Sequence, residues 1–269
     1  MKIFLKKSEV YKYTQNEKKL GFVPTMGAIH SGHISLIKRS IKECDKTIVT
    51  IFINKPQFNK KSDYLSYPKS IKKDIKLLKS HKIDFLYIPS HKEIYPHGPN
   101  KKIKINTFAK KLCGKNRPGH FEAVVDVICR FIKIIKPAKI YLGKKDMQQL
   151  KIVEDYINRN FKDIKVVGCK TIRDNNGLAI SSRNLLLSKK EKKIGSLVYK
   201  LILKNKKKII MKKNYLKSLH KKIKNLGIYS IDYLKIINTN KIIKPFKIKK
   251  EYRIFISYYL GRTRLIDNV

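Results

Sequence analysis

The chain has 269 residues, of which 42% are hydrophobic, enough for one large domain or two modest ones, so wholesale disorder is excluded. No apolar run approaches the roughly 20 residues of a membrane helix, and the basic start at residues 1–7 is too short in apolar content for a signal peptide. Four scattered cysteines without a Cys-x-x-Cys pair predict reduced thiols in a cytoplasmic protein, neither a disulfide framework nor a zinc site.

The charge balance is strongly basic, with 64 Lys and Arg against 19 Asp and Glu, a formal net charge of +45. Such an excess is typical of nucleic-acid-binding proteins. The lysines nevertheless run along the whole chain without a single basic block, and isoleucine and asparagine are abundant with them. We therefore attribute the charge to a coding bias toward A/T-rich codons, with polyanion binding as the alternative.

The apolar residues 20–23 predict a buried strand, followed by a Pro/Gly turn and a helix with Ile34, Ile37 and Ile41 on one face. His30 and His33 lie in the strand-to-helix turn between them. A helix N-terminus offers backbone N–H groups and partial positive charge to a phosphate, and imidazoles there can donate hydrogen bonds to it. The alternative is a turn with two solvent-facing histidines.

A β-branched run at residues 47–53 predicts a second strand, buried on both faces. Asn54 and Gln57 follow it. Ligands of parallel α/β sheets bind beyond the carboxyl ends of strands, so we expect these amides near a polar substrate. For each, a turn or cap role is the alternative. Residues 84–89 predict a further short strand.

The centre of the chain contains two more loop-to-helix junctions. Arg117 and His120 lie in a loop that opens a helix, within reach of a ligand, although His120 also fits a structural loop role. A strand at residues 140–142 then leads into Gly143 and the charged residues that follow it. Lysine there can screen phosphate charge and aspartate can accept a ribose hydroxyl, so this layout indicates a nucleotide site.

Residues 164–168 predict the last strand of this sheet, and a Gly- and Asn-rich connection follows. Its Ser181, Ser182 and Arg183 form a candidate phosphate clamp, or alternatively a helix cap with an exposed arginine. From residue 189 the composition changes to lysine-rich helices at 194–209 and 215–226 and strands at 229–237 and 252–259. The predicted fold is α/β, with a parallel-sheet domain at residues 1–175 and a smaller α+β domain at 176–269.

Six segments together resemble the pantoate–β-alanine ligase (pantothenate synthetase) family. They are residues 24–33, 51–58, 117–121, 143–150, 177–184 and 261–268, in the order expected for the family. The resemblance implies a Rossmann-like nucleotidyltransferase fold with a C-terminal lid domain. It also implies an ATP-dependent, AMP-forming ligase that condenses pantoate with β-alanine through pantoyl adenylate, with ATP as substrate together with Mg²⁺, no membrane or specific nucleic-acid partner, and a homodimer.

The resemblance also assigns roles to residues. His33 is implied as the proton donor, with His30 and Lys145 as its catalytic companions at the phosphates. ATP is implied to bind Met26, Gly27, Ala28, Ile29, His30, Ser31, Gly32, His33, Gly143, Lys144, Lys145, Asp146, Ile172, Ile180, Ser181, Ser182 and Arg183. Gln57 is implied to bind pantoate and β-alanine and Gln149 to bind pantoate, with Asn54 nearby. No protein metal ligand is firm, and Asp74 is the candidate.

Four positions depart from the family's usual pattern: Lys69, Ala123, Asp126 and Lys144. None removes a group that the chemistry needs, so the prediction is an active enzyme. The alternative within the same fold is another nucleotidyltransferase with a different substrate. Gln57 and Gln149, which suit a small hydroxy acid, distinguish the two.

Overall fold

The computed structural model describes residues 1–212, 214–246 and 248–269. Within these residues the chain divides into two compact units. The first consists of Met1–Lys144 and Gln148–Lys170, and the second of Lys145–Met147 and Thr171–Val269. The chain therefore passes into the second unit for three residues before it returns to complete the first.

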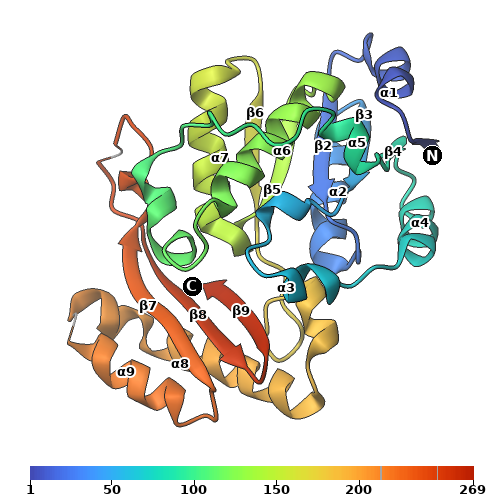
Figure 1. Ribbon diagram of the computed structural model, residues 1–269. Helices are drawn as coiled ribbons and strands as arrows, with labels where there is room; N and C mark the ends of the chain where they lie inside the picture. The colour runs from blue at the N-terminus through green and yellow to red at the C-terminus, as the bar shows by residue number, and fades with distance from the viewer. Residues whose placement is uncertain (213, 247) are drawn as a thin grey trace. The chain divides into compact units, whose positions relative to one another are not determined.

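The first unit is built on a parallel sheet whose six strands have the order β1-β4-β3-β2-β5-β6 (Figure 1). Its central strands are almost fully buried, as expected for a parallel sheet that helices cover on both faces. The strands are β1 (Lys2–Phe4), β2 (Leu20–Thr25), β3 (Lys46–Ile51), β4 (Phe85–Tyr87), β5 (Lys139–Gly143) and β6 (Lys165–Cys169).

Helices pack on both faces of this sheet because successive strand side chains point in opposite directions. Phe22 on β2 packs against Phe131 with the rings tilted and their centroids 5.7 Å apart, whereas the next residue, Val23, packs in a cluster with Ile34 and Ile37. The first unit contains α1 (Lys7–Thr14), α2 (Ser31–Glu43), α3 (Lys61–Leu65), α4 (Ile71–Ser80), α5 (His91–Ile94), α6 (His120–Ile135) and, from Gln148, α7 (Met147–Asn160).

The strand order changes direction at β2. From β2 the chain adds β3 and then β4 on one side, and later adds β5 and β6 on the other. In open parallel sheets ligands bind outside the carboxyl ends of the strands at such a switch point. The carboxyl ends of β2 and β5 are Thr25 and Gly143, so the topology predicts a ligand site at the segments that follow them.

The second unit is a three-stranded antiparallel sheet packed with two helices, α8 (Lys189–Met211) and α9 (Tyr215–Lys224). Its strands, in the order β7-β8-β9, are β7 (Ser230–Asn238), β8 (Tyr252–Leu260) and β9 (Thr263–Asn268). The central strand β8 contributes Ile254, Ile256 and Tyr258 to the core. Helix α8 begins with a capping box between Ser188 and Glu191, which satisfies backbone N–H groups at its first turn.

This architecture agrees with the predicted fold class, a parallel sheet followed by a smaller α+β part. The predicted boundary between residues 175 and 176 differs from the division between Lys170 and Thr171. The physical reason is that Arg173 binds Asp267 and pairs with Ala179, which ties residues 171–175 to the second unit. Strands β1 and β9 were not predicted as strands.

Candidate functional site

The turn between β2 and α2 is closed by contacts within the first unit. Thr25 Oγ1 donates to the carbonyl of Thr50 at 2.7 Å and accepts from the Gly27 N–H at 3.1 Å. Gly27 and Ala28 both have left-handed backbones, with φ values of 81° and 50°. Glycine adopts this conformation without strain, whereas in alanine it raises the conformational free energy. Other contacts must therefore hold the turn.

His30 is the N-cap of α2, and this fixes its chemistry. Its Nδ1 accepts a hydrogen bond from the Gly32 N–H at 3.1 Å. A neutral imidazole that accepts at Nδ1 carries its hydrogen on Nε2, so His30 presents a donor at that atom. The His33 ring stacks on it with centroids 4.0 Å apart and planes 21° from parallel. Two half-buried imidazoles therefore lie together at the carboxyl end of β2.

Gln57 is placed beside this turn by the short 3-10 helix η1 (Lys55–Gln57), which follows β3. Its Nε2 donates to Met26 Sδ at 3.1 Å, and its Oε1 accepts from Asn54 Nδ2 at the same distance. The structure thus brings together three residues that the sequence assigned to ATP and to substrate. Asn54 is only 1% exposed, so its contact with Gln57 orients that side chain.

Asn54 is itself anchored by Tyr95. The Tyr95 hydroxyl donates to Asn54 Oδ1 at 2.7 Å. Burial raises the pKa of Tyr95 well above its ordinary value, so this hydroxyl stays protonated and keeps donating. With Oδ1 occupied by Tyr95, the Asn54 amide nitrogen faces Gln57 Oε1 and the carbonyl of Ala123.

Arg117 and His120 both bind the backbone carbonyl of Gln57. Arg117 Nη2 lies 3.1 Å from this oxygen and His120 Nδ1 lies 2.9 Å from it, while Arg117 Nη1 and His120 Nε2 are 3.1 Å apart. His120 is 6% exposed. These contacts tie both side chains to the Gln57 backbone, as the structural alternative for His120 expects, and the ligand role of the two residues stays a prediction.

Two neighbouring glutamines on α7 have different surroundings. Gln148 is buried and bonds the carbonyls of Phe108 and Lys111 and the N–H of Cys113, so it holds a loop. Gln149, the predicted pantoate residue, is half-buried. Gln148 is therefore anchored to the loop, whereas the side chain of Gln149 has partial access to solvent.

In the second unit, residues 172–180 form a tight loop that places two predicted ATP residues opposite each other. The Ile180 N–H donates to the Ile172 carbonyl at 3.0 Å. Arg173 makes two hydrogen bonds to Asp267, at 2.6 and 2.9 Å, and its guanidinium stacks 3.7 Å from the Tyr199 ring centroid. The loop thus leads rigidly into Ser181, whose hydroxyl donates to Asn184 Oδ1 at 2.7 Å.

The second unit also contains Lys145 and Asp146, within the 3-10 helix η4 (Lys144–Asp146). The Lys145 carbonyl accepts from Asn268 Nδ2 at 2.8 Å, so β9 holds this backbone in place. Lys145 Nζ lies 3.6 Å from Asp146 Oδ2, and Asp146 is the more exposed partner. Ser182 is buried and Arg183 is half-buried in the helix η5 (Ser182–Leu186).

The comparisons with known proteins agree with this geometry. The pantoate-beta-alanine ligase family matches residues 2–269. Pantothenate synthetase of Sulfurihydrogenibium sp. is 37% identical over 257 residues, covering 94% of this chain and 92% of that protein. The enzyme of Thermosipho africanus is 36% identical over 276 residues, covering 100% and 99%. The chain belongs to the pantoate–β-alanine ligase family.

Solved structures of this family share the fold. Pantothenate synthetase from Thermus thermophilus superposes with a TM-score of 0.91 at 29% identity, covering 100% of this chain and 99% of that one. The pantoate–β-alanine ligase of Francisella tularensis, solved with β,γ-ATP and β-alanine, has a TM-score of 0.85 at 36% identity, covering 100% and 97%. These likenesses confirm the predicted fold class and the family resemblance.

Asp74 was the candidate metal ligand, and the structure gives its carboxylate another role. Oδ2 accepts from the Ala28 N–H and Oδ1 from the Ile29 N–H, both at 2.8 Å, and the residue is 3% exposed. Both oxygens therefore serve the turn, and the role of Asp74 as a metal ligand stays a prediction. Across residues 1–212, 214–246 and 248–269, no cluster of three or more His, Cys, Asp or Glu side chains is arranged to hold a metal ion.

The contacts by which Asp74, Tyr95 and Asn268 hold the predicted site residues were not predicted from the sequence. A signal for Asp74 exists: it is an acidic residue three positions after Ile71 on α4, inside the apolar stripe formed with Ile75 and Leu78. Tyr95 and Asn268 have no such local signal.

Among the described helices, none is long and apolar enough to cross a membrane.

One departure from the family pattern has a clear structural account. Asp126 is 3% exposed and binds Arg130 Nε at 2.8 Å and the Asn100 N–H at 2.9 Å. Arg130 in turn donates to the carbonyls of Ile94 and Gly98. A carboxylate in this position is therefore paired and organises the surrounding loop.

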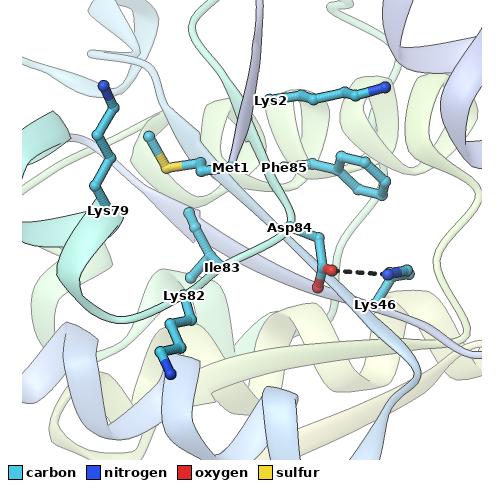
Figure 2. Close-up of a pocket in the computed structure, with 8 residues that line it drawn as sticks. All are labelled: Met1, Lys2, Lys46, Lys79, Lys82, Ile83, Asp84 and Phe85. Carbon is cyan, nitrogen blue, oxygen red and sulfur yellow. Dashed lines mark hydrogen bonds and ion pairs between the residues drawn. The ribbon is translucent and has the colours of Figure 1, made fainter.

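A pocket unrelated to these residues lies at the opposite, amino-terminal end of the sheet. It is lined by residues at the starts of β1, β3 and β4 and at the end of α4, among them Lys2, Lys46, Lys79 and Lys82. Figure 2 shows that the lysine side chains point in different directions, with Lys46 bound to Asp84. Charges that diverge in this way do not make a site for a single anion.

Proposed function

We propose that this chain joins pantoate to β-alanine in two steps. In the first, a carboxylate oxygen of pantoate attacks the α-phosphorus of ATP, and the bond to the β-phosphate breaks to release pyrophosphate. In the second, the amine of β-alanine attacks the carbonyl carbon of pantoyl adenylate. The amide bond forms, the amine loses a proton, and AMP leaves. Adenylation is needed because a free carboxylate is a poor electrophile.

The observation that carries this proposal is the pair of stacked imidazoles at the switch point of the sheet. Negative charge grows on the phosphate oxygens during the first step, and donors already in place stabilise it. The contact from Gly32 gives His30 a donor at Nε2. His33 is the proposed proton donor, and the stacking keeps it beside His30.

Substrate roles follow from the same turn. Gln57 approaches the turn through Met26 and is held by Asn54, so we assign it to pantoate and β-alanine. We assign the half-buried Gln149 to pantoate. The Francisella tularensis relative, solved with β,γ-ATP and β-alanine, supports these substrates for this chain.

The other nucleotide assignments rest on the family resemblance. They are Lys145 at the α-phosphate, Gly143, Lys144 and Asp146 nearby, and Ile172, Ile180, Ser181, Ser182 and Arg183 in the second unit. Mg²⁺ would be held chiefly by the phosphates of ATP, since the oxygens of Asp74 are engaged by backbone N–H groups. Bound in this way it would neutralise phosphate charge.

The test is pyrophosphate release from ATP and Mg²⁺, with pantoate and β-alanine added separately and together. Wild-type protein should release pyrophosphate only when pantoate is present, and turnover should collapse in His33→Ala. His220→Ala removes an exposed histidine on α9 and serves as the matched control. Release that does not depend on pantoate would indicate another nucleotidyltransferase.

We also propose that the chain forms a homodimer and works in the cytoplasm, where ATP is supplied. Both rest on the family resemblance. Light scattering coupled to gel filtration tests the first, with a mass near twice 31.5 kDa expected. A mass of a single chain at micromolar concentration would contradict it.

A further inference from the structure

The turn that bears His30 and His33 depends on one buried carboxylate. Asp74 reaches it from α4, and its two oxygens accept from the consecutive N–H groups of Ala28 and Ile29. Ser70 Oγ lies 3.4 Å from Oδ1 and adds a weaker contact. Bidentate hydrogen bonding to a charged acceptor is stronger than bonding to a neutral one, and it fixes orientation as well.

This contact holds a backbone that is otherwise strained. Ala28 has a φ of 50°, a conformation that costs a non-glycine residue on the order of 1 kcal/mol or more. Gly27, at 81°, has no room for a side chain: a Cβ there would lie 3.1 Å from Asp74 Oδ2 and 3.2 Å from Ile51 Cγ2. Such conformations persist only where the surroundings over-determine them.

The contact also decides which groups remain to meet a phosphate. The N–H groups of Ala28 and Ile29 bind Asp74, that of Gly27 binds Thr25, and that of Gly32 binds His30. The sequence had suggested that the backbone of this turn cradles ATP. Four N–H groups of the turn are therefore engaged by the protein itself, and the binding of ATP by the rest of the turn stays a prediction.

We propose that Asp74 is a positioning residue for the adenylation step. Its carboxylate holds residues 27–29 closed, and the closed turn sets His30 and His33 in their stacked arrangement. The inference rests on the proposed function and deepens it. It differs from the metal-ligand hypothesis for Asp74 in its expected Mg²⁺ dependence, which the substitution Asp74→Asn measures.

Asp74→Asn tests the idea with little change in volume. Its amide nitrogen faces one of the two N–H groups, so one of the two acceptors is lost. The kcat of pantoate-dependent pyrophosphate release should fall about 10- to 100-fold, since small misplacements of reacting groups have effects of this size. The Mg²⁺ concentration for half-maximal activity should stay within two-fold. Asp45→Asn, an exposed aspartate, should leave both values unchanged.

A second substitution supplies a rescue. Ala28→Gly removes the strain of the left-handed backbone, so a closed turn needs the carboxylate less. The double variant Ala28→Gly/Asp74→Asn should have a kcat at least three-fold higher than that of Asp74→Asn alone. Purely global destabilisation by Asp74→Asn would show no such recovery.

Gly27→Ala provides an independent approach if Asp74→Asn does not fold. It disturbs the same contact from the turn and leaves the carboxylate intact, so it should lower kcat similarly without changing the Mg²⁺ requirement. The proposal is overturned if Asp74→Asn raises the Mg²⁺ requirement ten-fold or more at unchanged saturating kcat. It is also overturned if folded Asp74→Asn retains wild-type kcat.

Hydrogen–deuterium exchange separates this inference from the proposed function. Without any substrate, the peptide covering residues 26–33 should exchange at least ten-fold faster in Asp74→Asn than in wild type or Asp45→Asn. Unchanged exchange would overturn the proposed role of Asp74 in holding the turn closed, even if the enzyme is active. If wild-type protein releases no pyrophosphate, the proposed function fails, whereas faster exchange would still support the contact.

Discussion

Polar side chains gather at both ends of the parallel sheet in the first unit, but they are arranged differently. At the carboxyl end, His30 and His33 stack on each other, and Gln57 contacts Met26 of the same turn. At the amino end, Lys2, Lys79 and Lys82 line a pocket and point apart (Figure 2). In a chain with a charge of +45, basic residues occur almost everywhere, so their number identifies no site. A site is identified instead by polar groups that converge on one place and are held there by other residues.

The largest effect is expected from His33→Ala, at the carboxyl end. Removing one donor to developing negative charge costs about 10²- to 10³-fold in kcat. Pyrophosphate release under saturating ATP and pantoate measures it, with circular dichroism to show that the variant is folded. A loss of less than about three-fold would remove His33 from the catalytic set.

Gln57→Ala should have the next largest effect, mainly on substrate affinity. Loss of a neutral hydrogen bond is worth about 1 kcal/mol, and two of them together give about ten-fold or more. We expect the KM for pantoate to rise about ten-fold with a smaller change in kcat. Gln15→Ala, at an exposed position, is the control. An unchanged KM would assign pantoate to other residues.

Tyr95→Phe should act more weakly, because it removes only the hydroxyl that anchors Asn54. The buried Asn54 oxygen loses its donor, which costs about 1–3 kcal/mol of stability. Urea unfolding measures this loss, and kcat/KM for pantoate should fall a few-fold because Gln57 is less well oriented. Tyr229→Phe, at a 78% exposed position, should change neither. Equal effects of the two substitutions would contradict the anchoring role.

The smallest effect is expected at the amino end. Lys79→Gln combined with Lys82→Gln lowers the formal charge from +45 to +43. The double variant should keep its kcat and its KM values for ATP, pantoate and β-alanine within two-fold of wild type. The melting temperature should stay level or rise slightly at low salt, because self-repulsion falls. A ten-fold loss of activity would show that the pocket in Figure 2 takes part in the reaction.

The sequence predicted much of the fold because its strands are buried on both faces. Runs such as residues 47–53 are continuously apolar or β-branched, so their character shows without knowledge of their neighbours. Strands β1 and β9 were missed for the opposite reason. The segment Lys2–Phe4 has one buried residue in three, and Thr263–Asn268 mixes buried and half-buried positions. Strand β1 pairs with β4, which lies far away in the chain, whereas β9 pairs in a hairpin with β8, which directly precedes it.

The candidate site shows the same division. His30, His33, Gln57 and Gln149 were predicted as site residues because they follow strands or belong to recognisable motifs. Their supports come from elsewhere in the chain: Asp74 contacts residues 45 and 46 positions away, and Tyr95 contacts one 41 positions away. The contact of Tyr95 leaves no periodic or local pattern, and that of Asp74 shows only as an acidic residue in the apolar stripe of α4.

The sequence alone was sufficient to predict the family, the α/β class and the turn that bears the two histidines. The tertiary structure decided how those groups are held. It engaged four backbone N–H groups of the turn, fixed the His30 tautomer through Gly32, and oriented Gln57 through Asn54. The physical reason is that residue identity follows from local patterns, whereas hydrogen-bond partners are chosen only when distant segments pack together.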